Sequence, residues 1–122
     1  MKKTNEEYSM LYDYYGALLS TRQREVFEFY NEENFSLSEI AENIGVSRQA
    51  VHIAVSKAGA ELEKYEEKLG LIAKHRAYEK TLGEIDGRID AILKDKVHAV
   101  LLDPDMVKTL RRIKKIIKEL DI

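Results

Sequence analysis

The stretch SLSEIAENIGVSRQAVHIAV, residues 36–55, decides the fold of this chain. It contains two helical patterns separated at Gly45, a residue that readily adopts the left-handed conformation at which helices end. Ser47 then offers a side-chain oxygen to the unpaired N–H groups of a second helix. These signals predict a helix-turn-helix in which Ile44 closes the first helix and Val46 fills the corner.

The second helix of this motif has one apolar face and one face available to a partner. Its apolar residues recur at helical spacing and are expected to pack on the first helix: Ala50, Val51, Ala54 and Val55. The exposed start of such a helix usually meets the major groove of DNA. The candidate nucleic-acid-binding residues are Ser47, Arg48, Gln49, His52, Ser56 and Lys57.

The residue types at the start of this helix allow two kinds of partner. Arg48 can pair with a guanine edge or a phosphate, and Gln49 with an adenine edge. Ile53 favours a protein partner, with a partly buried place in the fold as the alternative.

The rest of the chain also predicts helices. There is one proline in 122 residues, and Leu, Ala, Glu and Lys are frequent, which favours an all-α fold. Capping boxes begin helices at Ser20 and Ser36, residues 31–35 form a loop, and the helix of the motif continues to Leu69. Aromatic residues at helical spacing predict core packing rather than a base-stacking platform: Tyr8, Tyr12, Tyr15, Phe27 and Tyr30.

The last third predicts two more helices. One spans residues 71–101, where Leu82, Ile85, Ile89 and Ile92 form an apolar seam and Gly83 and Gly87 bend the helix or admit a close neighbour. The other runs over residues 104–120, with Asp103 as its cap and Pro104 in its first turn. The sequence thus predicts a helix-turn-helix domain (1–70) and a helical extension (71–122). The extension either dimerises or folds back on itself.

Charge is distributed unevenly between these two parts. Residues 1–70 hold 8 Lys and Arg against 13 Asp and Glu, a net charge of −5, whereas residues 71–122 hold 12 against 9, a net charge of +3. The last helix presents a second candidate basic surface for phosphates, particularly those of RNA: Lys108, Arg111, Arg112, Lys115 and Lys118. The alternative is a solvated face that complements the helix dipole.

Several classes of function find no support in the sequence. The absence of cysteine excludes disulfides and thiol catalysis, and His52, His75 and His98 are too far apart to predict a metal site. We find no catalytic motif and no phosphate-binding loop, and we expect neither enzymatic activity nor a cofactor. The N-terminus lacks the apolar region of a signal peptide, and no apolar run approaches the roughly 20 residues of a membrane helix. We therefore expect a cytoplasmic protein without membrane contact.

Two resemblances rest on these motifs. LLSTRQREVFEFYNEENFSLSEIAENIGVSRQAV, residues 18–51, resembles region 4 of the bacterial sigma-70 factors, a helix-turn-helix unrelated to the winged-helix type. A narrower similarity, over residues 8–80, is to the YlxM family of small bacterial proteins. It rests on residues 12–15 and 18–21, on FSLSEIAENIGVSRQAV (35–51) and on ELEKYEEKLGL (61–71).

The YlxM resemblance implies an all-α accessory protein of the signal recognition particle pathway. Genes of this family neighbour that of the particle's GTPase, so the implied partners are the particle RNA and this GTPase. No catalytic residues are carried over. Two alternatives remain open: a sequence-specific DNA-binding transcription regulator, acting as a homodimer with recognition helices about 34 Å apart, and a protein-interaction module that contacts RNA polymerase.

Overall fold

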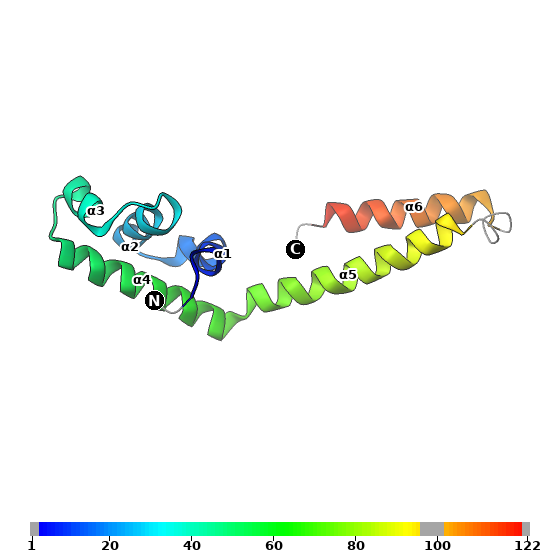
Figure 1. The fold of residues 1–122 in the computed structure, drawn as a ribbon. Helices are drawn as coiled ribbons and strands as arrows, with labels where there is room; N and C mark the ends of the chain where they lie inside the picture. The colour runs from blue at the N-terminus through cyan, green and yellow to red at the C-terminus, as the bar shows by residue number, and fades with distance from the viewer. Residues whose placement is uncertain (1–2, 96–101, 121–122) are drawn as a thin grey trace. The chain divides into compact units, whose positions relative to one another are not determined.

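The computed structural model describes residues 3–95 and 102–120, and all regular structure within them is helical (Figure 1). The α-helices are α1 (Asn5–Tyr15), α2 (Thr21–Phe27), α3 (Leu37–Ile44), α4 (Arg48–Leu69), α5 (Leu71–Lys94) and α6 (Pro104–Glu119). A 3-10 turn, η1 (Gly16–Leu18), follows α1, and a π-helical turn, η2 (Glu28–Glu32), extends α2. The predicted all-α fold is confirmed. The chain divides into two compact units, Met1–Ile72 and Ala73–Ile122.

The starts of α1, α2 and α3 are fixed by reciprocal side-chain and backbone hydrogen bonds. At α3, the Glu39 N–H donates to Ser36 Oγ and the Ser36 N–H donates to Glu39 Oε1, both at 3.1 Å. The predicted box at Ser20 and Gln23 begins α2 in the same way. A third box, Thr4 with Glu7, begins α1 and was missed in the sequence. Each box satisfies N–H groups that would otherwise have no partner.

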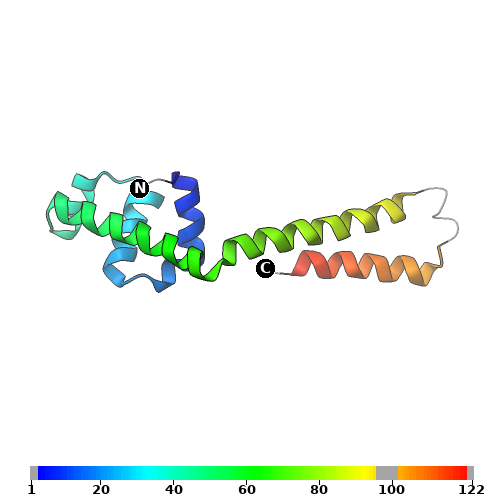
Figure 2. The same cartoon turned by 90° about the horizontal axis from the view of Figure 1, so that it is seen from below.

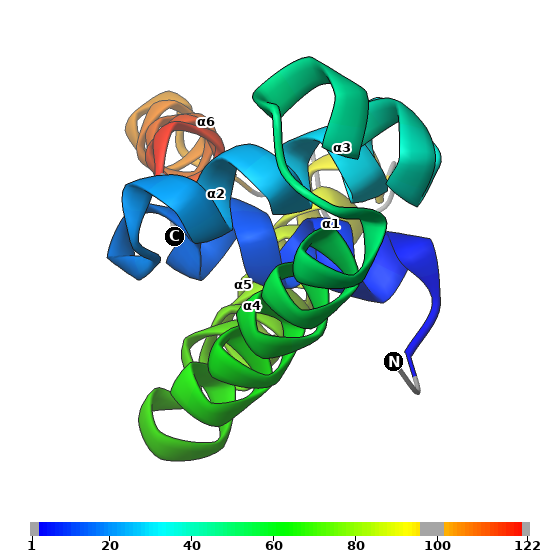
Figure 3. The same cartoon turned by 90° about the vertical axis from the view of Figure 1, so that its left-hand side faces the viewer.

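The core of the N-terminal unit forms where α1, α2 and α3 pack on α4 (Figures 2 and 3). Its largest fully buried side chains are Tyr8, Tyr15, Phe27, Ile40, Leu62, Val26 and Val51. The rings of Tyr8 and Phe27 meet edge to face, with centroids 5.8 Å apart. These rings are part of the core, as predicted, and are not available for base stacking.

The predicted loop over residues 31–35 begins later than expected. The helix continues as a π turn to Glu32, which brings Asn31 inward, where it is only 4% exposed. Its Nδ2 donates to the carbonyl oxygen of Asn5 at 3.2 Å and to Ser9 Oγ at 3.0 Å. A polar residue next to a turn was therefore taken for a loop residue, although its Nδ2 finds acceptors on α1.

The end of α4 and the start of α5 are joined by side-chain hydrogen bonds. Gly70 ends α4 in the left-handed conformation, at φ 61°. The first N–H groups of α5 then find side-chain acceptors: Leu71 donates to the Tyr15 hydroxyl at 3.1 Å, and Ile72 donates to Glu66 Oε1 at 3.0 Å. The Tyr15 hydroxyl itself donates to Glu66 Oε1. One buried tyrosine thus connects α1 to the junction between α4 and α5.

In the C-terminal unit, α5 and α6 lie side by side and antiparallel (Figures 1 and 2). The last helix folds back on α5, which is one of the two arrangements predicted for the extension. Asp103 caps it by accepting from the Asp105 N–H at 3.0 Å. Lys114 Nζ joins the helices, because it lies 2.9 Å from Asp86 Oδ1 and 2.7 Å from Asp90 Oδ1.

The length of α5 differs from its prediction. It ends at Lys94 rather than at residue 101, and residues 96–101 lie outside the described part of the chain. The sequence has no glycine or proline between Gly87 and Pro104, so nothing in its pattern marks this end.

The left-handed glycine at the turn gives a test of stability. We expect Gly45→Ala to lower the free energy of unfolding by about 1–2 kcal/mol, because an L-residue is strained at its φ of 71°. An added Cβ would meet nothing within 4 Å, so no steric clash contributes. Urea unfolding of the full chain followed by circular dichroism measures the change.

Gly83→Ala is the matched control for this test. Gly83 lies within α5 without positive φ, and its added Cβ also meets nothing within 4 Å. The open space argues against the close approach of another helix, which was one of the alternatives predicted for Gly83. Alanine here should stabilise the chain by about 0.5–1 kcal/mol. A loss of stability at Gly83 equal to that at Gly45 would contradict the argument from backbone conformation.

The buried Tyr15 hydroxyl predicts sensitivity to high pH. Burial, and then the hydrogen bond to Glu66, raise the pKa of Tyr15 above its usual value near 10. The folded state thus holds the phenolic proton more tightly than the unfolded state, and this contribution to stability is lost as the pH rises above about 10. Tyr15→Phe should cost about 1–3 kcal/mol near neutral pH and should weaken this alkaline loss. Urea unfolding at neutral and alkaline pH measures both effects.

Tyr78→Phe provides the control, since Tyr78 lies in α5 and is 52% exposed. This substitution should leave the free energy of unfolding within about 0.5 kcal/mol of the original at both pH values. Equal behaviour of the two variants would show that the Tyr15 hydroxyl does not stabilise the junction.

Candidate nucleic-acid interface

The turn between α3 and α4 is built from local hydrogen bonds. Gly45 and Val46 both donate their N–H groups to the carbonyl oxygen of Ala41, at 2.9 and 3.1 Å, which closes α3. Ser47 Oγ accepts from the Ala50 N–H at 3.0 Å and begins α4. Val46 does not fill the corner as predicted. It is 38% exposed, although its N–H donates to Ala41 at the end of α3.

The start of α4 is held against the unit by one line of apolar residues. Val51, Val55 and Ala58 are buried, as the helical spacing requires. Ala54 is half-buried, and Ala50 is exposed although it was predicted to pack inward. Because each helical residue turns by about 100°, Ala50 lies well off the line of the buried residues.

The predicted contact residues divide into an exposed group and two that are engaged in the fold. Arg48, Gln49, His52 and Lys57 are exposed, together with Ile53 at 45%. Ser56 is half-buried, and Ser47 is exposed but uses its oxygen to cap the helix. Helical geometry places Gln49, His52 and Ser56 on one face of α4, and this face extends to Ile53.

A shallow depression of about 200 Å³ lies beside this face. His52 and Ser56 line it from α4, and Tyr30 and Leu37 from the elements before the turn. Lys3 and Asn5 also line it, from the start of the chain. The sequence did not point to these last two residues, because only folding brings them next to α4.

The acidic charge of the N-terminal unit does not lie on the start of α4. Between Ser47 and Ala60 the only charged residues besides His52 are Arg48 and Lys57, and the acids of α4 begin at Glu61. The first half of the helix is therefore positive, although the residues 1–70 together are acidic.

The second candidate basic surface is divided between two sides of α6. Arg111, Lys115 and Lys118 line a groove of about 400 Å³ between α5 and α6, whereas Lys108 and Arg112 do not. The groove also contains Lys94 and Lys114, two cations that the sequence did not single out. A hydrogen bond from Lys114 lowers the pKa of Asp90, which keeps this carboxylate charged.

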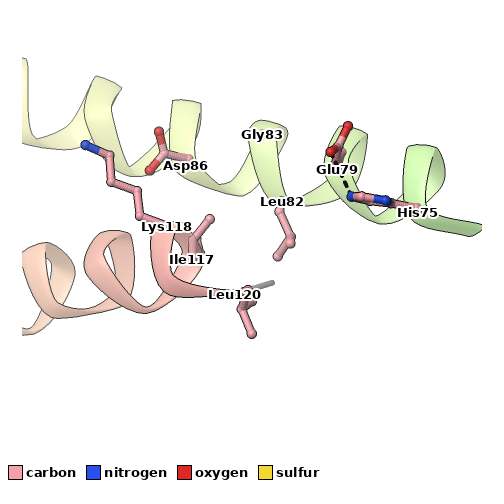
Figure 4. Close-up of a pocket in the computed structure, with 8 residues that line it drawn as sticks. All are labelled: His75, Glu79, Leu82, Gly83, Asp86, Ile117, Lys118 and Leu120. Atoms are coloured by element: carbon pink, nitrogen blue, oxygen red, sulfur yellow. Dashed lines mark ion pairs between the residues drawn. The ribbon is translucent and has the colours of Figure 1, made fainter. Parts of the chain in front are cut away.

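A second hollow between α5 and α6, of about 260 Å³, shares Lys118 with the groove (Figure 4). Leu82, Ile117 and Leu120 give it apolar walls, and His75 Nε2 lies 2.8 Å from Glu79 Oε1 at its edge. Within the described residues, no three His, Asp or Glu side chains are grouped so that they could hold a metal ion. None of the helices there is both long and apolar enough to span a bilayer.

Comparison with known proteins places this geometry in a family. Residues 1–100 match the model of the family UPF0122, described as "Putative helix-turn-helix protein, YlxM / p13 like". The UPF0122 protein of Thermoanaerobacter sp. (strain X514) is 39% identical over 114 residues, 93% of each chain. The Listeria welshimeri relative is 36% identical over 115 residues, which cover 94% of this chain and 97% of its own.

A third relative, the UPF0122 protein of Caldanaerobacter subterraneus subsp. tengcongensis, is 49% identical over 77 residues, 63% of this chain and 66% of its own. The match to the family model and the long alignments agree with the helix-turn-helix seen in α3 and α4. Membership of a helix-turn-helix family supports a role in nucleic-acid binding. The chain belongs to the UPF0122 family of YlxM- and p13-like helix-turn-helix proteins.

Proposed function

We propose that this protein is a non-enzymatic accessory protein that binds nucleic acid through the start of α4. The observation that carries this proposal is an exposed face of α4 that holds Gln49 and His52 and is bordered on opposite sides by Arg48 and Lys57. No acidic residue occurs in α4 before Glu61. The buried residues Val51 and Val55 hold that face in place, so a partner meets a preformed surface.

The chemistry of this face fits both parts of a nucleic-acid contact. Arg48 and Lys57 supply positive charge for phosphates, which provides most of the sequence-independent affinity. Gln49 offers an amide that can donate to and accept from a base edge. Ile53, at 45% exposure, adds an apolar side chain that suits a thymine methyl group or an apolar protein surface.

We further propose that the target belongs to the signal recognition particle pathway, either the particle RNA or its GTPase. This finer assignment rests on the resemblance to the YlxM family and on the basic charge of α6. It predicts binding to the particle RNA or the GTPase that weakens with added salt. No binding to either at low salt would exclude this pathway while leaving DNA as a target.

The alternative is a transcription regulator that binds DNA as a homodimer. Exposed apolar side chains on one flank of the α5–α6 hairpin favour a second copy as partner: Tyr78, Ile85, Ile92, Met106, Ile113, Ile116 and Leu120. Among the described residues after Ile72, only Ile89 is buried. Two such hairpins would bury their apolar flanks together as a four-helix bundle.

Arg48 gives the test of nucleic-acid binding. Arg48→Ala should weaken binding to the particle RNA or to duplex DNA by about 5- to 150-fold, the value of one good base or phosphate contact. The slope of log affinity against log salt should fall by about 1. Fluorescence anisotropy at several salt concentrations measures both quantities.

Lys68→Ala is the matched control, because it removes the same charge from an exposed position of the same helix. Lys68 lies 20 residues after Arg48, or about 30 Å along the helix axis. The affinity of the Lys68→Ala variant for the same nucleic acid should stay within about twofold of that of the original protein. If Arg48→Ala bound as tightly as Lys68→Ala, α4 would not be the interface, and capture of a partner that survives nuclease treatment would then identify a protein-interaction module.

The dimer has its own test. Ile113→Asp places a charge on the exposed apolar flank of α6 and should convert a dimer into a monomer. Arg112→Asp places the same group one residue earlier, on the outward face of α6, and should leave the dimer intact. Sedimentation equilibrium distinguishes the two states, and a monomer in the unchanged protein would exclude the homodimer.

A further inference from the structure

We infer that the groove between α5 and α6 is a second binding site, and that it takes the phosphodiester backbone of a nucleic acid. The groove lies wholly in the unit Ala73–Ile122 and is separate from the start of α4. The inference rests on the proposed function, because it adds a phosphate-binding site to a protein proposed to bind nucleic acid.

The first observation is the concentration of positive charge around one groove. Five of its lining residues are cations and one is an acid: Lys94, Arg111, Lys114, Lys115, Lys118 and Asp90. The groove residue Lys114 is already paired with Asp86 and Asp90. The net charge left on the other side chains is therefore positive, and like charges held this close repel each other unless an anion joins them.

The second observation is that some of these cations form ion pairs with acidic side chains and others do not. Lys94 lies 3.7 Å from Asp90, and Lys115 lies 4.0 Å from Glu119, both exposed pairs of little strength. Arg111 and Lys118 form no ion pair within the described residues. At least these two side chains are free to bind an external anion.

The spacing of the cations favours an extended anion over a compact one. Arg111, Lys115 and Lys118 follow one another at intervals of four and three residues, which places them along about 10 Å of the same side of α6. Lys94 faces them from α5 across the groove. A single phosphate ion is too small to contact this whole line, whereas consecutive phosphates of one strand follow it.

The placement of the apolar residues argues against a membrane surface as the ligand. A helix that lies on a membrane inserts an apolar face bordered by cations. In this hairpin Val107, Leu110 and Ile117 are half-buried, which identifies the side of α6 packed on α5. The exposed residues Met106, Ile113 and Leu120 lie on one flank of that side, and the groove cations lie on the other. A membrane that contacted the groove cations would therefore not contact the apolar flank of α6.

The sequence supplies a matched pair of double variants for the test. Arg111→Gln with Lys118→Gln removes two charges from the groove, and Arg112→Gln with Lys108→Gln removes the same two residue types from positions of α6 outside it. Each full-length variant is titrated by fluorescence anisotropy against a labelled RNA duplex and a DNA duplex of about three helical turns, at about 50 and about 200 mM salt.

The groove variant should bind about tenfold or more weakly at the lower salt concentration, and its salt slope should fall by about 2, one for each lost phosphate contact. The outside variant should stay within about twofold of the original. Equal losses for the two variants would overturn the site, because they would show a diffuse effect of charge. The absence of any loss for either variant would overturn it as well.

Arg48→Ala, measured beside them, separates this inference from the proposed function. If only Arg48→Ala lost affinity, α4 would remain the interface and the groove would be excluded as a binding site. If only the groove variant lost affinity, the groove would remain a binding site and α4 would be excluded as the interface. Vesicles containing phosphatidylserine form the last arm: weaker vesicle binding by the groove variant, with unchanged binding to both duplexes, would assign the groove to lipid headgroups and overturn the phosphodiester assignment.

Discussion

The fold of the N-terminal unit depends on the burial of one face of α4. Val51, Val55, Ala58 and Leu62 lie along this face, and α1, α2 and α3 pack on the same helix. Burial of such side chains contributes roughly 1.5–3 kcal/mol for each of the larger ones. Because the candidate interface lies on the same helix, its exposed side chains take their orientation from the core and not from a mobile loop.

A second constraint joins the far end of α4 to the start of α5. Tyr15 and Glu66 accept the first N–H groups of α5, and Ile72 is buried in the core of the N-terminal unit. The start of α5 is therefore part of this unit by its contacts. The first two N–H groups of α5 thus find their acceptors within the N-terminal unit.

Most features set by local chemistry were predictable from the sequence, although the cap at Thr4 was missed. The caps at Ser20, Ser36 and Ser47 and the left-handed Gly45 depend on residues within one turn of each other, and the structure confirms them. The buried Asn31 was not predictable, because its partners Asn5 and Ser9 are more than 20 residues away in the chain.

The same distinction applies to the candidate sites. Arg48, Gln49 and His52 were predicted from the helix-turn-helix pattern, and the structure leaves them exposed. Lys94 lines the groove only because α5 packs beside α6. No pattern within α5 distinguishes this lysine from the others, so it could not be predicted. The side of α6 to which each cation belongs likewise required the position of α5.

The double ion pair of Lys114 has a consequence for how the hairpin keeps its register. Asp86 and Asp90 are one turn apart, and α6 carries Arg111 one turn before Lys114 and Lys118 one turn after it. If α6 slid along α5 by one turn, about 5.4 Å, another cation would come opposite the two aspartates. Charge pairing thus holds the helices together without choosing among these registers. The choice of register is therefore left to the apolar contacts between α5 and α6.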